Sequence, residues 1–402
     1  MTESSSTESR SAAREAAIAR PWVVLSCATS LDGYLDDTTA QRLLLSNDAD
    51  FDRVDALRAS VDAILVGAGT VRADNPRLLV RSPERRAARV AVGQPASPLR
   101  VVVSGSSKLD RDAAVFTAPG AETVVYSGHN GTSAGNGNSN SSENSTENST
   151  AAGRSLDFGD LLDYLARRGV RRLMVEGGAS VLTRFLAEDL ADELQLAVAP
   201  FLLGDPEAPR AFGSGGYPQS PHRRMILAES RVIGDVQFSR YLINRPGPDA
   251  ASDARLLRLA VELSRSCPPV MGAFSVGAVV TDAHGAVIST GYSREPLHGL
   301  GDPNKNHAEE VALAKLDPAD PRLKSACVYT SLEPCSPRSS RPLSCTDHIL
   351  AAGIPRVVLA LREPALLALC DGADRLRAAG VEVIELSELG GQVRAINAHL
   401  LG

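Results

Sequence analysis

A proline- and glycine-rich stretch, NRPGPDAASD at 244–253, most constrains what this chain can fold into. Two prolines and a glycine within ten residues interrupt both helices and strands, and such a segment is typical of a linker between domains. The chain has 402 residues, which is more than one ordinary hydrophobic core organises. We therefore predict two domains, at 21–243 and 254–402, joined by this linker.

Two further segments lack the apolar residues that a packed core needs. Residues 1–20 are rich in Ser, Glu, Arg and Ala, and residues 128–153 are almost entirely Gly, Asn, Ser, Thr and Ala. We expect a disordered N-terminus and a flexible loop within the first domain. The loop contains Asn-x-Ser/Thr triplets, which match glycosylation acceptors, but a polar linker is the favoured interpretation because no signal segment is visible.

Charge and composition exclude several classes of partner. The formal net charge is −6, aromatic residues are 4% of the chain, and there is one Trp. Without a run of Lys or Arg or a stacking platform, we expect no nucleic-acid partner. No apolar stretch reaches the roughly 18–20 residues that span a bilayer and no export signal is seen, so we expect no membrane partner and a cytoplasmic location. Six cysteines are too sparse for a disulfide framework and are expected to remain thiols.

Between residues 21 and 243, short apolar runs alternate with amphipathic stretches, which predicts an α/β domain with a parallel core sheet. Alternation at 231–243 favours an antiparallel pair at the edge of that sheet. The predicted strands are 22–25, 63–66, 101–103, 123–126, 173–175 and 194–199, and the predicted helices are 51–59, 158–168 and 180–190.

The region after the linker has a different order of elements. A helix comes first, then a hairpin, and then helices that alternate with single strands, which favours a three-layer α/β/α sandwich. The predicted helices are 255–265, 307–316, 344–352 and 373–379, and the predicted strands are 274–281, 287–291, 327–330, 356–360 and 381–384.

A His-Ala-Glu triplet and two later cysteines in this region form a candidate metal site. His307, Cys335 and Cys345 offer one imidazole and two thiolates, which leaves the fourth position of a tetrahedral Zn²⁺ open for water. Zinc lowers the pKa of its bound water toward about 7, and Glu309 is placed to carry the proton to a departing amine. Taken singly, a His or a Cys pair ten residues apart is commonplace, but the joint pattern is that of a nucleobase deaminase.

Glycines after two predicted strands form a second candidate site, in the first domain. Gly67 and Gly69 follow the strand at 63–66, and Gly177, Gly178, Ala179 and Ser180 lead from the strand at 173–175 into a helix. Glycines allow a backbone to approach a phosphate, and free N–H groups at a helix start can hold one. The motif at 67–69 lacks the third glycine of a dinucleotide-binding fingerprint, so a tight strand-end turn is the competing interpretation.

The second domain resembles the cytidine-deaminase-like superfamily and, within it, the pyrimidine deaminases of riboflavin biosynthesis. The resemblance covers about 254–390 and is carried by PPVMGAFSVGAVV, HAEEVALAKL and YTSLEPCSPRSSRPLSC. The segment between Cys335 and Cys345, together with GYSRE, looks more like the fungal form. That form acts after the reduction step, so the resemblance implies reduction before deamination.

The first domain resembles the reductase domain of riboflavin biosynthesis, a relative of dihydrofolate reductase. The resemblance covers about 21–243 and is carried by ATSLDGYL, LRASVDAILVGAGTVRADNPRLLVR, VEGGASVLTRFL and ADELQLAVAPFLLG. It departs from many bacterial members at Ser26, where they have Lys, and at Leu44, where they have Trp. The resemblance implies an NADPH site lined by Ala28, Leu44, Thr70, Asp74 and 178–184, and a substrate site lined by Arg42, Arg58, Leu78, Arg81 and Glu176.

Together the two resemblances imply a bifunctional enzyme that uses NADPH and Zn²⁺ on phosphorylated pyrimidines, with the domains in the reverse of the usual bacterial order. The reductase would transfer hydride to C1′ of a ring-opened ribosylamino group, with Arg58 and Arg81 gripping the sugar phosphate and Glu176 accepting hydrogen bonds. Because the reductase family is often dimeric, a homodimer is expected. Two alternatives stay open: an enzyme for another pyrimidine or secondary metabolite, and a non-catalytic nucleotide-binding regulator.

Overall fold

The computed structural model describes residues 20–39, 41, 43–105, 109–127, 132–134, 156–243, 253–268, 270–336, 341–364 and 370–401. The segments predicted at 1–20, 128–153 and 244–253 therefore lie almost wholly outside the described residues. The chain divides into two compact units, Met1–Ile243 and Asn244–Gly402. Among the described helices, none combines the length and the apolarity that crossing a bilayer requires.

A nine-stranded sheet forms the centre of the first unit. Its order is β5-β4-β3-β2-β6-β1-β7-β9-β8. The six strands from β4 to β7 in this order run parallel, while β5, β9 and β8 pair antiparallel at the two edges. The predicted parallel core with an antiparallel edge is confirmed. The strands are β1 (Trp22–Thr29), β2 (Ala63–Gly67), β3 (Leu99–Ser104), β4 (Thr123–Ser127), β5 (Thr132–Ala134), β6 (Arg172–Gly177), β7 (Glu193–Val198), β8 (Ile226–Ile233) and β9 (Val236–Leu242).

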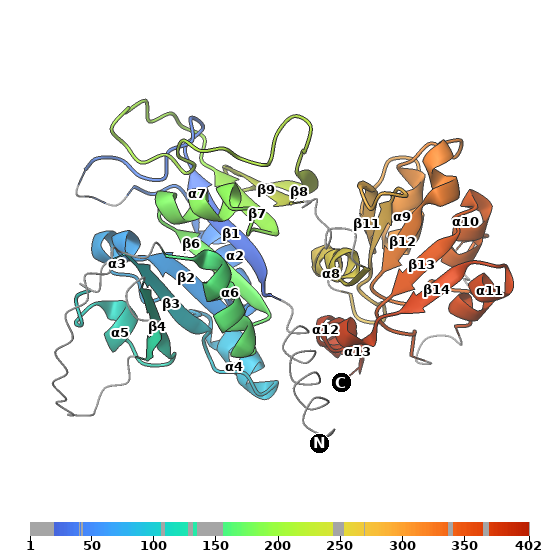
Figure 1. The fold of residues 1–402 in the computed structure, drawn as a ribbon, viewed down its shortest axis with the longest axis horizontal. Coiled ribbons are helices and arrows are strands. Elements are labelled where there is room, and N and C mark those ends of the chain that lie inside the picture. The colour runs from blue at the N-terminus through green and yellow to red at the C-terminus, as the bar shows by residue number, and fades with distance from the viewer. Residues whose placement is uncertain are drawn as a thin grey trace, which may run out of the picture. The chain divides into compact units, whose positions relative to one another are not determined.

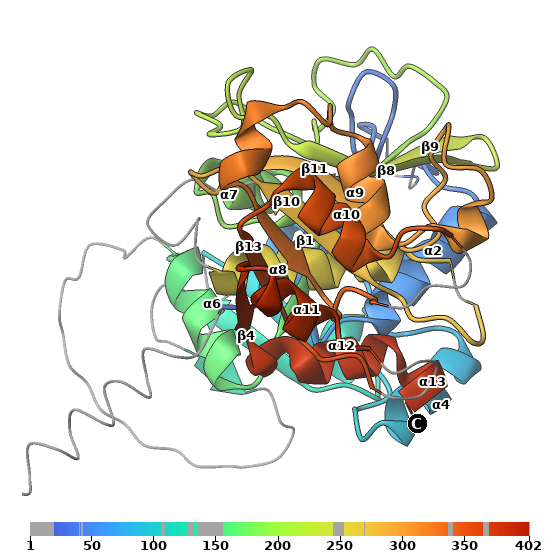
Figure 2. The ribbon, with the colours of Figure 1, turned by 90° about the vertical axis from the view of Figure 1, so that its right-hand side faces the viewer.

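Helices cover both faces of this sheet, because its central strands are apolar on both sides. Alternate strand residues such as Val23, Leu65 and Leu173 pack with the apolar stripes of α6 and α7 in one core. Helix α2 lies on the other face, and Figure 2 shows α6 and α2 on opposite sides of β1. The helices are α2 (Asp48–Ala59), α3 (Ala68–Asp74), α4 (Pro83–Ala91), α5 (Ala114–Thr117), α6 (Phe158–Arg167) and α7 (Ala179–Ala187).

A five-stranded sheet, in the order β11-β10-β12-β13-β14, forms the centre of the second unit. Strand β10 pairs antiparallel with β11 and β12, and β12, β13 and β14 run parallel. The strands are β10 (Gly277–Thr281), β11 (Val287–Tyr292), β12 (Cys327–Thr330), β13 (Arg356–Leu359) and β14 (Glu382–Glu385).

Helices on both faces of the second sheet make the predicted three-layer sandwich. Ala308, Ala312, Ile349 and Leu376 of three helices pack on one face of the sheet, and α8 packs against β10 and β12 from the other face (Figure 1). The helices are α8 (Asp253–Leu263), α9 (Ala308–Ala314), α10 (Cys345–Ala352), α11 (Gly372–Ala378), α12 (Gly390–Ile396) and α13 (Ala398–Leu401). Short 3-10 turns occur at Ser264–Ser266, Pro303–Lys305, Pro321–Ser325 and Ser387–Leu389.

Several predicted elements differ from the structure. The predicted glycine turn at 67–69 is instead the start of helix α3, with Gly67 as its N-cap in extended backbone. Helix α4 was not predicted, the helix predicted at 180–190 ends at Ala187, and the strand predicted from residue 274 begins at Gly277. The antiparallel pair begins at Ile226, five residues before its predicted start.

Candidate functional site

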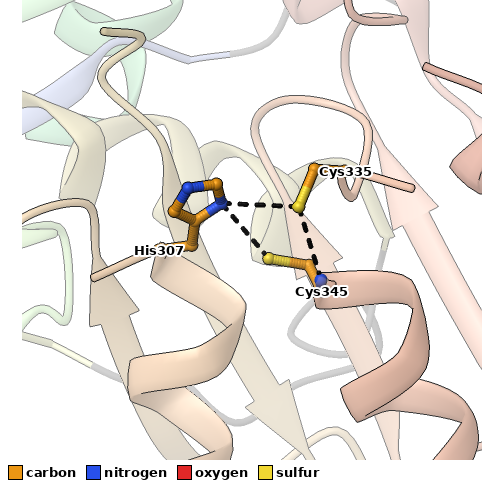
Figure 3. Close-up of side chains that lie close together, drawn as sticks. All are labelled: His307, Cys335 and Cys345. Atoms are coloured by element: carbon orange, nitrogen blue, oxygen red, sulfur yellow. Dashed lines mark hydrogen bonds between the residues drawn. The ribbon is translucent and has the colours of Figure 1, made fainter. Parts of the chain in front are cut away.

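Two strand-to-helix junctions of the second unit, from β11 to α9 and from β12 to α10, bring the predicted metal ligands together. His307 is the N-cap of α9, Cys345 is the first residue of α10, and Cys335 lies in the segment between β12 and α10. The Nδ1 atom of His307 is 3.5 Å from the Sγ atoms of both Cys335 and Cys345 (Figure 3). The backbone N–H of Cys345 also donates to Cys335 Sγ at 3.4 Å.

This donor set fits a tetrahedral zinc ion. With ordinary Zn–N and Zn–S bond lengths, a tetrahedron separates a nitrogen from a sulfur ligand by about 3.5 Å, and His307 Nδ1 meets both sulfurs at that distance. Hydrogen bonding from Cys345 and the nearby His307 ring lower the pKa of Cys335 far below that of a free thiol. A thiolate is the form of cysteine that binds metal, so the local electrostatics favour ligation.

Glu309 lies in the same buried environment as this donor set. Its side chain is 3% exposed, and its Oε1 accepts a hydrogen bond from Thr330 Oγ1 at 2.5 Å. Burial raises the pKa of Glu309, although the hydrogen bond from Thr330 opposes that effect. A carboxyl group that holds a proton more readily than usual is suited to passing one on.

Glu310, the next residue, makes contacts that differ from those of Glu309. One of its oxygens accepts from the backbone N–H of His307 at 3.4 Å, and the other lies 3.2 Å from Arg341 Nε. These contacts engage both carboxylate oxygens of Glu310 and leave Glu309 as the candidate proton carrier.

Glu363, which the sequence analysis did not single out, interacts electrostatically with Cys335, His307 and Glu309. Burial, together with the negative charge of Cys335, raises the pKa of Glu363 to about 7. Its backbone N–H donates to the buried Glu333 at 3.1 Å, which fixes the segment after β13. No sequence signal marks Glu363, because it follows Cys345 by 18 positions and belongs to no ligand motif.

Two adjoining cavities lie at the carboxyl ends of β1 and β6 in the first unit, where ligands of open α/β sheets bind. The larger, about 550 Å³, is lined by Ala28, Leu44, Gly69, Thr70, Asp74 and 177–180, among others. The smaller, about 160 Å³, is lined by Ser26, Asp50, Arg53, Asp55, Arg58, Arg81 and Glu176, among others. Cys27, Ala28, Ser46, Phe51 and Glu176 line both cavities, so a molecule in one would contact a molecule in the other.

Most of the predicted cofactor residues gather at the larger cavity, but Gly67 and residues 181–184 do not line it. Gly67 is fully buried in the sheet and lines neither cavity, and a Cβ atom there would meet Val181 Cγ2 at 3.0 Å. Gly67 therefore allows β2 to pack against α7. Leu44 is 69% exposed at the edge of the cavity, and Gly178 has a φ of +61°, which favours glycine.

Three of the five predicted substrate residues lie together at the smaller cavity. Arg58, Arg81 and Glu176 line the smaller cavity, whereas Leu78 is 2% exposed and lines neither cavity. Arg42 lies outside the described residues. Arg58 does not face the cavity as an isolated cation, because Glu176 holds its guanidinium with two hydrogen bonds.

Comparison with known proteins matches the two units to two different families. Residues 21–237, more than half of the chain, match the RibD C-terminal domain family, and residues 250–361 match the cytidine and deoxycytidylate deaminase zinc-binding region. The 2,5-diamino-6-ribosylamino-4(3H)-pyrimidinone 5′-phosphate reductase of Archaeoglobus fulgidus is 35% identical over 190 residues, which are 47% of this chain and 85% of the relative.

Two other relatives cover different parts of the chain. The diaminohydroxyphosphoribosylamino-pyrimidine deaminase of Schizosaccharomyces pombe is 42% identical over 129 residues, 31% of this chain and 30% of the relative. The riboflavin biosynthesis protein RibD of Bacillus amyloliquefaciens is 34% identical over 234 residues, 57% of this chain and 56% of the relative. The chain thus spans only part of these two proteins. It belongs to the RibD C-terminal domain family and joins that pyrimidine reductase domain to a zinc-binding deaminase domain, as bifunctional proteins of riboflavin biosynthesis do.

Proposed function

We propose that this chain catalyses two reactions on phosphorylated pyrimidines. The domain at 21–243 reduces a ribosylamino side chain to ribitylamino with NADPH, and the domain at 254–402 replaces a ring amino group by oxygen and releases ammonia. The observation that carries the proposal is the three-donor group of His307, Cys335 and Cys345 beside the buried Glu309. A structural zinc site has no need of such a carboxylate.

In the deaminase domain, bound zinc would activate water as the nucleophile that attacks the ring carbon. His307, Cys335 and Cys345 would hold the ion through Nδ1 and the two Sγ atoms. The Glu309 carboxylate would take up the proton of the attacking water and deliver it to the departing amine, while Thr330 fixes its Oε1. Glu363 would add a second carboxyl group near the substrate.

In the reductase domain, NADPH supplies the hydride and the chain positions the two reactants. The larger cavity would take the cofactor, with its phosphates near the N-terminus of α7, and the smaller would take the substrate. Ala28 and Glu176 line both cavities, which would place the nicotinamide and the reacting carbon next to each other. Arg81 would bind the sugar phosphate as a charge-assisted pair.

We further propose that reduction precedes deamination. The Archaeoglobus fulgidus relative is named as a reductase of a 2,5-diamino pyrimidinone, which still carries its ring amino group. A chain that joins this kind of reductase to a deaminase would keep consecutive steps together and raise the local concentration of the intermediate. A cytoplasmic location and a homodimer are parts of the same proposal.

Purified chain supplied with zinc, NADPH and each candidate intermediate tests these assignments. We expect NADPH oxidation with the ribosylamino diaminopyrimidine and ammonia release from its ribitylamino product. Faster ammonia release from the ribosylamino compound would reverse the order. Inactivity toward both, with turnover of another pyrimidine, would favour the alternative of a different substrate.

The Glu309→Gln substitution separates catalysis from regulation. It should lower ammonia release about 100- to 10,000-fold while the zinc content is retained. NADPH oxidation by the same molecules serves as the internal control and should stay unchanged. Unchanged ammonia release would remove Glu309 from the mechanism and favour a non-catalytic, nucleotide-binding role.

A further inference from the structure

Three carboxylates line the smaller cavity of the first unit, and two of them are fully partnered. Both oxygens of Glu176 accept hydrogen bonds from Arg58. Asp55 accepts from the backbone N–H groups of Arg81 and Ser82 and from the guanidinium of Arg85. Neither carboxylate therefore needs a ligand to complete its hydrogen bonding.

Asp50 is the third carboxylate, and it differs from the other two. Its side chain is fully buried, and its Oδ1 accepts a hydrogen bond from Arg53 Nε at 2.6 Å. Its Oδ2 is also buried, but within the described residues it has no hydrogen-bond partner. A buried carboxylate oxygen without a donor is costly, and folded proteins seldom leave one unless something else satisfies it.

Arg53 prevents Asp50 from turning to find another donor. The Nη1 of Arg53 donates to Gln195 Oε1 at 2.8 Å, and its guanidinium lies 4.4 Å from the centre of the Phe238 ring. Asp50 lies in the first turn of α2, where its backbone N–H is bound by the N-cap Asn47. Arg53 thus holds the Asp50 carboxylate, and Asn47 fixes the backbone of Asp50, at a residue that lines the cavity.

The contacts of Arg53 also connect Asp50 to the strands that line the smaller cavity. Gln195 of β7 is paired in the sheet with Ser26 of β1, and Ser26 lines the cavity beside Arg53. Arg53 and Asp50 thus form an ion pair at a cavity that Ser26, a small neutral side chain, also lines. An oxygen held in this setting is a strong acceptor for a donor on a bound molecule.

We propose that Asp50 is a substrate-binding residue of the reductase site, and that its Oδ2 accepts a hydrogen bond from an N–H or O–H group of the pyrimidine substrate. This inference rests on the proposed reductase function. It assigns Asp50 and Arg53 as one unit, in which the arginine orients the carboxylate and the carboxylate binds the substrate.

The test compares Asp50→Asn with the matched control Asp52→Asn in the full-length, zinc-loaded protein. Asp52 lies on the same helix, and its side chain is 68% exposed and bound to Arg85. Asp50→Asn should raise the KM for the ribosylamino pyrimidine phosphate about 10- to 100-fold, the effect of losing a hydrogen bond to a charged group. Asp50→Asn should keep the wild-type Kd for NADPH and the wild-type rate of ammonia release. Asp52→Asn should match the wild type in its kinetics.

Ribose 5-phosphate, which lacks the pyrimidine, identifies the donor. If Asp50→Asn also weakens binding of ribose 5-phosphate, the donor is a sugar hydroxyl. If only the complete substrate is affected, the donor is an amino or ring N–H group. Both results support the proposal, whereas an Asp50→Asn enzyme with KM and ribose 5-phosphate affinity within twofold of wild type overturns it.

A second variant covers the case in which Asp50→Asn does not fold. Asp50→Glu keeps the negative charge facing Arg53 and can extend into the cavity, so it should fold and still raise the KM. An unchanged KM in Asp50→Glu would then overturn the proposal. Wild-type protein that fails to oxidise NADPH with the ribosylamino substrate would instead refute the proposed function, which is a separate outcome.

Discussion

Arg58 and Glu176 join α2 to the end of β6 through a bidentate ion pair, with Nε–Oε1 at 2.5 Å and Nη2–Oε2 at 2.6 Å. Each side chain is only 13% exposed. The sequence resemblance assigned Arg58 to a phosphate, but the pair neutralises its charge. Arg81 lines the same cavity, and its guanidinium lies 5.8 Å from the centre of the Phe51 ring. Among the described residues, no carboxylate is paired with the guanidinium of Arg81, so the net positive charge of this wall comes from Arg81.

Arg81→Ala should therefore act through the phosphate of the substrate. We expect kcat/KM for the phosphorylated substrate to fall about 10- to 100-fold, because a charged hydrogen bond is lost. For the dephosphorylated compound, the variant and the wild type should differ by less than threefold. Steady-state NADPH oxidation with both compounds measures the two ratios. Equal losses on both compounds would contradict a phosphate-binding role.

Arg58→Lys is the comparison for this experiment. A lysine keeps the charge but cannot form the two parallel hydrogen bonds to Glu176. The variant should lower kcat/KM by a similar factor for the phosphorylated and the dephosphorylated compound, because it disrupts the Arg58–Glu176 pair in the cavity wall and not a contact to the phosphate. We expect the first unit to lose about 1–3 kcal/mol of unfolding free energy as well.

The sequence predicted elements with an apolar pattern far better than elements held by polar contacts. Strand Cys327–Thr330 has its predicted bounds, because its residues are buried on both faces. Helix α4 has no apolar stripe to reveal it, and its buried Arg89 instead donates to the backbone oxygens of Ala59 and Val61. The cap signals were present, however: Ser82 accepts from the N–H of Arg85, and Pro83 opens the helix.

Metal analysis of cysteine variants tests the zinc assignment. We expect one zinc per wild-type chain and loss of zinc in Cys345→Ser, because a hydroxyl is a poor substitute for a thiolate ligand. Cys370→Ser is the matched control, since Cys370 Sγ donates to Pro334 O at 3.5 Å but is not part of the three-donor group. Cys370→Ser should keep its zinc and its ammonia release. Equal zinc loss in the two variants would refute the ligand set.

The metal site was predictable because its residues form a short motif, whereas the substrate cavity was predictable only in part. His307 and Cys345 occupy helix starts that their sequence neighbours specify. Asp50, Arg53 and Glu363 come from helix and loop positions with no motif. Their proximity to the sites depends on how α2 and the segment after β13 pack against the sheets, which local sequence does not encode.

Gly178→Ala should impair only the reductase. Gly178 has a φ of +61° and a ψ of 139°, a region almost restricted to glycine, and a Cβ atom there would lie 3.2 Å from Thr70 Oγ1. The resulting strain, about 1–3 kcal/mol, should weaken NADPH binding about tenfold or more. A titration with NADPH measures the effect. Gly216→Ala is the control, since a Cβ atom at Gly216 has no neighbour within 4 Å, and ammonia release should be unchanged in both variants.

Glu193 links the stability of the first unit to pH. Burial alone would raise its pKa, but Arg240, which donates at 2.8 and 2.9 Å, and Arg172 lower the pKa of Glu193 from 4.5 to about 2. A carboxylate with a depressed pKa stabilises the fold fully above its ordinary pKa, and that contribution is lost as pH falls toward the folded value. For Glu193 it amounts to about 3 kcal/mol at neutral pH.

Urea unfolding at pH 7, 4 and 3 of the wild type and of Glu193→Gln measures this contribution. Trp22 is the only tryptophan in the sequence and donates its indole N–H to Glu193 at 3.3 Å, so its fluorescence reports directly on this part of the sheet. Glu193→Gln should be the less stable protein at pH 7, and the difference should narrow as the pH falls below about 4.5. It should not vanish, because the variant leaves Arg240 without its carboxylate at every pH. A difference that stays constant from pH 7 to pH 3 would show that Glu193 does not carry this linkage.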